Sequence, residues 1–174
     1  MNQKFRSLTL SAIMASLVFV TTFFVHIPIP GTESGYLNVG DVVVYLAAVI
    51  PGGWYGIAAS ALGSVIADIA SGSVIYAPAT FLIKGLMTFI TWVIVSKKKR
   101  TGSFLIGCIL SGLIMVLGYF IYELAVFGIA YALVGIPYNL IQYVCGVVAA
   151  IVLFVFLRKL PINRFISIDI RNKK

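Results

Sequence analysis

The chain has 174 residues, of which 61% are hydrophobic and only 10% are charged, and its mean hydropathy is +1.08. Because a soluble domain usually carries about 25% charged residues, this composition excludes a soluble globular protein and indicates an integral membrane protein. A spanning helix needs roughly 20 apolar residues, so the length admits five or six helices. We expect one membrane domain over residues 1–174 and no soluble domain.

Basic residues outnumber acidic ones by thirteen to five, which gives a formal net charge of +8. Twelve of the thirteen lie in three places: Lys4 and Arg6, the run from Lys97 to Arg100, and the chain from Arg158 onward. All three flank apolar segments, which is the positive-inside pattern of cytoplasmic helix ends. No basic stripe is interleaved with exposed aromatic residues, so we expect no nucleic-acid partner.

Six apolar segments predict six membrane-spanning helices, over about residues 5–25, 39–50, 55–70, 79–96, 103–124 and 138–157. The first segment is too long for a signal peptide and precedes no small-residue cleavage site, so we expect it to be retained. The prolines and glycines of HIPIPGTESGY (26–36) end that helix. The stretch AVFGIAYALVGIP (125–137) is predicted to be a structured connection between the last two spans.

The charge pattern supports this count. If the N-terminus, the KKKR turn and the basic tail are all cytoplasmic, an even number of spans must separate each pair, and six spans give four and then two. A five-span chain without the short second segment would break the rule. We therefore expect an all-α membrane protein of six transmembrane helices with cytoplasmic N- and C-termini.

With this topology, the polar residues inside the spans all lie in the outer half of the bilayer. An ionisable side chain at mid-bilayer costs about 2.5–3.5 kcal/mol, so such residues are rarely idle and usually line a cavity. Their shared depth predicts one outward-facing pocket, in which tyrosine rings can stack on a flat ligand. The predicted binding residues are Glu123, Lys84, Asn139, Gln142, Tyr36, Tyr76, Asp68 and Asn38.

Several of these polar residues have structural alternatives. Asp68 and Lys84 flank a short loop and would also suit a structural ion pair, while Asp41 would suit the first turn of a helix, where the macrodipole favours a carboxylate. Glu123 has no obvious local cation, which makes it the first candidate for a ligand contact. His26 is interpreted as an interfacial residue rather than a ligand contact.

Nothing in the chain resembles a catalytic or metal-binding motif. There is a single histidine and no HExxH, GxSxG or Walker lysine, so we expect no enzyme activity, no metal and no cofactor. Cys108 and Cys145 lie far apart in apolar runs and are expected to be buried small hydrophobic residues. A pocket without an energy source implies passive transport or a partner that supplies the energy.

Three stretches in order, GYLNVGD (35–41), PGGWYGIAASALGSVIADIASG (51–72) and YAPATFLIKGL (76–86), together resemble the substrate-binding S component of energy-coupling factor (ECF) vitamin transporters. The resemblance covers essentially the whole chain. The third stretch is most similar to the type assigned to hydroxymethylpyrimidine or vitamin B6 compounds.

The resemblance implies a subunit of the bacterial plasma membrane that captures a vitamin from outside. It then docks onto one transmembrane coupling protein and two ATPases. The family's AxxxA docking motif corresponds to Ala12 and Ser16, with Ala15 adjacent, and Ser16 departs from it while remaining small. The loop 26–36 matches the family's gating loop.

With Asp68 and Lys84 cancelling, Glu123 favours a neutral or weakly cationic ligand such as pyridoxine or hydroxymethylpyrimidine. The single lysine disfavours phosphorylated vitamers. Two alternatives stay open: an S component for another vitamin, such as riboflavin or thiamin, and a membrane scaffold that does no transport. An intramembrane enzyme ranks third.

Overall fold

The computed structural model describes residues 3–32, 35–98 and 100–159, and these residues are almost entirely helical. The predicted basic tail beyond residue 159 therefore lies outside the described residues. The elements in chain order are α1 (Gln3–Phe24), β1 (Ile27–Pro28), β2 (Tyr36–Leu37), α2 (Gly40–Ala47), α3 (Gly53–Ala70), the 3-10 helix η1 (Val74–Tyr76), α4 (Ala77–Lys97), α5 (Thr101–Phe127) and α6 (Ile129–Lys159).

Five of the described helices, α1, α3, α4, α5 and α6, are long and apolar enough to cross a membrane. The sixth, α2, has only 8 residues, of which Gly40, Asp41, Val42, Val44, Tyr45, Leu46 and Ala47 are buried. A helix this short rises about 12 Å, far less than the roughly 30 Å hydrocarbon core. The sequence prediction of six transmembrane helices is therefore not confirmed, because the second segment forms only a short helix buried in the bundle.

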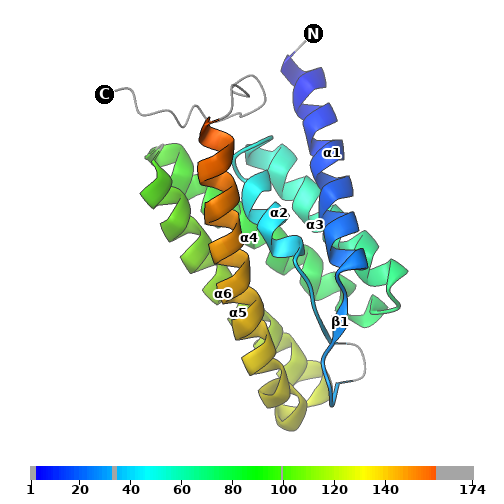
Figure 1. Cartoon of the computed structure of the whole chain (residues 1–174). Coiled ribbons are helices and arrows are strands. Elements are labelled where there is room, and N and C mark those ends of the chain that lie inside the picture. The colour runs from blue at the N-terminus through cyan, green and yellow to red at the C-terminus, as the bar shows by residue number, and fades with distance from the viewer. Residues whose placement is uncertain (1–2, 33–34, 99, 160–174) are drawn as a thin grey trace.

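The two ends of the bundle differ in character (Figure 1). The start of α1, the turn between α4 and α5 and the end of α6 lie at one end, where the described basic flanks gather. The β1–β2 hairpin, which pairs Ile27 with Leu37 and Pro28 with Tyr36, lies at the other end. The described basic flanks therefore lie together at one end of the bundle, as the charge pattern predicts.

Small residues let the helices pack closely. A Cβ on Gly63 of α3 would overlap the backbone oxygen of Ala15 in α1, and a Cβ on Gly56 would overlap that of Ala47. Such backbone approach is a common packing mode inside a bilayer. Large apolar side chains instead cover the outer surface, where they face lipid, including Leu8, Leu82, Leu117 and Val152.

The stretch 125–137 is helical, so the prediction of a structured connection there is wrong. Helix α5 continues to Phe127, a break occurs at Gly128, whose φ is +87°, and α6 begins at Ile129 and runs through Pro137. In an apolar environment the backbone must satisfy its own hydrogen bonds, which favours helix on both sides of the break. Gly128 makes the break possible because glycine adopts a positive φ at little cost.

Candidate functional site

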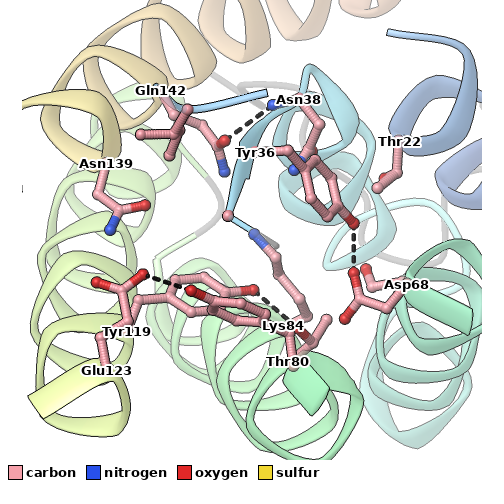
Figure 2. Close-up of a pocket in the computed structure, with 14 residues that line it drawn as sticks. Thr22, Tyr36, Asn38, Asp68, Thr80, Lys84, Tyr119, Glu123, Asn139 and Gln142 are labelled. Carbon is pink, nitrogen blue, oxygen red and sulfur yellow. Dashed lines mark hydrogen bonds between the residues drawn. The ribbon is translucent and has the colours of Figure 1, made fainter. Parts of the chain in front are cut away.

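A pocket lies at the hairpin end of the bundle, and all eight predicted binding residues line it (Figure 2). They come from the hairpin region and from α3, η1, α4, α5 and α6. The cavity between the lining side chains is small, about 30 Å³, well below the roughly 300–1,000 Å³ of typical ligand pockets, so a bound ligand requires the lining side chains to move apart. The remaining lining residues are Thr22, Ile29, Gly35, Ser64, Thr80 and Tyr119.

The β1–β2 hairpin forms one side of this pocket through Tyr36. The Tyr36 hydroxyl donates a hydrogen bond to Asp68 Oδ1 on α3, and its ring stacks on His26 with centroids 4.0 Å apart. Burial, reinforced by the Asp68 charge, raises the pKa of Tyr36, so the hydroxyl keeps its proton and acts as the donor. Burial also lowers the pKa of His26, with Asp68 opposing that shift, which favours a neutral ring.

Lys84 pairs with Asp41, not with Asp68 as the sequence alternative proposed. The Lys84 Nζ donates to Asp41 Oδ1, and both side chains are buried. Asp41 is in the first turn of α2, as expected, and its carboxylate also serves this ion pair. The ammonium group lies 5.4 Å from the centre of the Tyr119 ring, within cation–π range. The charge of Lys84 is therefore balanced by Asp41, which does not line the pocket, and Lys84 forms no ion pair with Asp68.

Gln142 connects this ion pair to the base of the hairpin. Its Nε2 donates to Asp41 Oδ2 at 2.7 Å, and its Oε1 accepts from the backbone N–H of Asn38 at 2.9 Å. The Asn38 side chain in turn accepts from the backbone N–H of Gly40 at 2.9 Å. Because a carboxylate only accepts and an N–H only donates, these partners fix the orientation of the Gln142 amide.

Glu123 lies on the opposite side of α4 from Asp68, on α5 (Figure 2). Its Oε1 accepts from the Tyr76 hydroxyl at 3.1 Å, and Tyr76 is also hydrogen-bonded to the Tyr131 hydroxyl at 3.2 Å. Within the described ranges the buried Oε2 has no hydrogen-bond partner. Tyr76 packs beside Tyr119, Tyr122 and Phe127, which gives this side of the pocket an aromatic wall.

Three of the six pocket residues that the sequence prediction left out have a common spacing. Ser64, Thr80 and Tyr119 each lie four positions before a predicted residue, namely Asp68, Lys84 and Glu123. Residues four apart share a helix face, so this spacing was the signal that could have found them. Thr80 and Tyr119 are joined by a 3.1 Å hydrogen bond between their hydroxyls.

The three predicted docking residues divide between two faces of α1. Ala12 and Ser16 are exposed, and the Ser16 hydroxyl donates to the Ala12 backbone oxygen at 3.0 Å. Ala15 is half-buried and packs against the bundle core, with its backbone against Gly63. Ala12 and Ser16 are thus accessible from outside the subunit, whereas Ala15 packs inside it.

The pocket lining consists of polar and aromatic side chains, and none of its described residues is an activated nucleophile. The described residues contain no group of three or more metal-ligating side chains. What the pocket presents is hydroxyls, amides, carboxylates and aromatic faces, the chemistry of a polar ring-binding site. Taken with the membrane-spanning helices, these features define a multi-pass membrane protein with a polar pocket between its helices.

Residues 2–159 match the family described as the ECF-type riboflavin transporter, S component. The chain belongs to this family, and it is an S component rather than an enzyme. A solved structure described as the S component of a bacterial ECF transporter superposes with a TM-score of 0.75, covering 91% of this chain and 98% of that chain at 23% identity. At that identity the likeness establishes the fold.

Two curated proteins are similar in sequence. An uncharacterised protein of Pyrococcus woesei is 36% identical over 131 residues, which is 75% of this chain and 87% of that protein. The thiamine precursor transporter HmpT of Lactococcus lactis subsp. cremoris (strain MG1363) is 30% identical over 152 residues, 87% of each chain.

Proposed function

We propose that this S component captures a small single-ring vitamin or vitamin precursor, with hydroxymethylpyrimidine ahead of pyridoxine, from outside a bacterial cell. The observation that carries the proposal is the pocket itself, in which all eight predicted side chains surround a small cavity beneath the hairpin. The hairpin, whose Tyr36 lines the cavity, lies at the end of the bundle away from the described basic flanks (Figure 1), and those flanks favour the cytoplasmic side.

The size and chemistry of the pocket favour a single ring. A cavity of about 30 Å³ must widen for any ligand, and it needs to widen less for one flat heteroaromatic ring than for the fused rings and polyol chain of riboflavin. The ring can stack on Tyr76 and Tyr119, while hydroxyl or amino substituents meet carboxylates and amides. The resemblance to a thiamine precursor transporter supports hydroxymethylpyrimidine within this class.

The second half of the proposed function is delivery to an energy-supplying partner. We infer that the exposed face of α1 around Ala12 and Ser16 docks onto the transmembrane protein of an ECF module whose two ATPases drive release. Small exposed side chains on a membrane helix allow a partner helix to approach closely. The buried position of Ala15 limits the docking surface to Ala12, Ser16 and their exposed neighbours.

The test is a binding panel on the purified full-length chain in lipid nanodiscs. Hydroxymethylpyrimidine, pyridoxine, thiamin and riboflavin are titrated by calorimetry, because neither Trp54 nor Trp92 lines the pocket to report binding by fluorescence. We expect binding of hydroxymethylpyrimidine below 1 μM, roughly −8 kcal/mol, and weak or no binding of riboflavin. Tight binding of riboflavin alone would identify riboflavin as the ligand, and no binding of any of the four compounds would favour the membrane-scaffold alternative.

A further inference from the structure

Two buried carboxylate oxygens of the pocket, Asp68 Oδ2 and Glu123 Oε2, have no hydrogen-bond partner among the described residues, and Glu123 is the one that faces α6. Glu123 is 3% exposed, and while its Oε1 accepts from Tyr76, its Oε2 has no hydrogen bond within the described part of the chain. A buried acceptor with no donor is costly. Because Glu123 lines the pocket, a ligand N–H or O–H can supply the missing donor.

Gly135 determines where this free oxygen lies. A Cβ added to Gly135 on α6 would overlap Glu123 Oε2, so the carboxylate occupies the space that the missing side chain leaves. Asn139 follows one turn later on the same face of α6, lines the same pocket and is 6% exposed. Its side-chain amide makes no hydrogen bond to any described residue, so its N–H and C=O groups are both available.

We propose that Glu123 Oε2 and the Asn139 amide together recognise the edge of a ring that carries an amino group beside a ring nitrogen, and that Gly135 is the positioning residue for the carboxylate. The amino N–H donates to Oε2, and the ring nitrogen accepts from the Asn139 N–H. This edge belongs to aminopyrimidines and is absent from pyridoxine. The inference rests on the proposed function and narrows its ligand class.

The charges around the pocket agree with a donor-rich ligand. Lys84 forms its ion pair with Asp41, while Glu123 and Asp68 line the cavity and form no ion pair with a described residue. The pocket therefore favours ligands that present N–H and O–H groups and disfavours phosphate esters.

The experiment compares hydroxymethylpyrimidine with its oxo analogue, in which a carbonyl oxygen replaces the amino group, by calorimetry on the full chain in nanodiscs. We expect the amino compound to bind about 10- to 100-fold tighter, as for a hydrogen bond to a charged group. In Glu123→Gln this preference should collapse to below about 3-fold. Equal binding of the two compounds to the wild type would overturn the recognition, whereas failure of both to bind would overturn the proposed pyrimidine capture itself.

Gly135→Ala tests the positioning role. The clash is with the far end of a flexible glutamate, so the carboxylate can turn away and the thermal unfolding midpoint should stay within a few degrees of wild type. The affinity for the amino compound should fall about 10-fold or more, and the oxo analogue should be unaffected. Gly146→Ala on the same helix is the control, since its Cβ would meet Asp41 Cβ at an ordinary 3.4 Å.

A double-mutant cycle separates positioning from general damage. If Gly135 acts through Glu123, then adding Gly135→Ala to Glu123→Gln should lower the affinity for hydroxymethylpyrimidine by less than about 2-fold. A full additional 10-fold loss, or wild-type affinity of Gly135→Ala alone, would overturn the assignment of Gly135.

Discussion

At the scale of single residues, the site depends on a buried ion pair that the ligand is not expected to touch directly. Asp41 accepts from both Lys84 and Gln142, two residues that line the pocket from α4 and α6. Asp41 itself does not line it. A single carboxylate on the short helix α2 therefore fixes two pocket side chains, and its loss should disturb stability and binding together.

We expect Asp41→Asn to destabilise the protein by about 3–5 kcal/mol, the usual cost of leaving one member of a buried pair uncompensated. Replacing both partners, as in Asp41→Asn with Lys84→Met, should recover most of that loss because no buried charge remains. Chemical unfolding of the purified protein in detergent micelles measures both variants. A single variant as stable as wild type would mean that water reaches the Lys84 ammonium.

At the residue level, the sequence could predict which polar residues lie near one another, whereas their role in binding stays a prediction. Polar residues at similar depth on different helices come together when the helix faces that carry them pack against each other, and all eight predicted residues line one pocket. The pairing among them was not predictable. Sequence distance favoured Asp68 as the partner of Lys84, but the packing of α2 against α4 brings Asp41 to it instead.

At the scale of elements, the hairpin is held over the pocket by two side-chain contacts. Tyr36 donates to Asp68 on α3, and the Asn38 backbone N–H donates to Gln142 on α6. Each strand has only two residues, so backbone pairing alone gives the hairpin little stability. These two side-chain contacts therefore determine how firmly the hairpin closes.

Tyr36→Phe should loosen this closure. The ring can still stack on His26, but the hydrogen bond to Asp68 is lost, which costs about 1.5–3 kcal/mol for a charged acceptor. We expect faster dissociation of the bound ligand, by roughly 10-fold or more, with a smaller change in the association rate. Stopped-flow competition with unlabelled ligand measures both rates. An unchanged dissociation rate would mean that the Gln142 contact alone holds the hairpin.

The predicted boundaries of the last two spans were wrong because turn-forming residues and the backbone's need for hydrogen bonds favoured different structures. Gly128 and Pro137 indicated a connection between the last two spans, but the need for internal backbone hydrogen bonds keeps both sides helical. The predicted length of the second span was wrong for a different reason. Its apolar run reads as a short span, yet only Gly40–Ala47 is helical, because PGGW at 51–54 ends the run and α2 needs only to cross the protein interior.

At the scale of the whole molecule, capture and docking occupy different surfaces. The pocket lies inside the bundle at the hairpin end, and the exposed docking pair, Ala12 and Ser16, lies on the outer face of α1. The residue of α1 that lines the pocket, Thr22, is buried, whereas the docking pair is exposed. A change on the outer face of α1 should therefore separate binding from transport.

Ala12→Trp is the variant that tests this separation. The indole would project from an exposed position, so ligand affinity by calorimetry and the unfolding midpoint should match wild type. Uptake of radiolabelled ligand by cells that express the chain with an ECF module should stop, because a large side chain prevents the close helix approach that small residues permit.

Ala15→Trp provides the contrast on the same helix. Ala15 is half-buried against the bundle core and its backbone meets Gly63, so an indole there should overpack α1 against α3 and destabilise the fold by about 1–3 kcal/mol. If Ala12→Trp abolished ligand binding, the outer face of α1 would contribute to ligand capture. If Ala12→Trp kept full uptake, the partner would have to dock on another surface of the bundle.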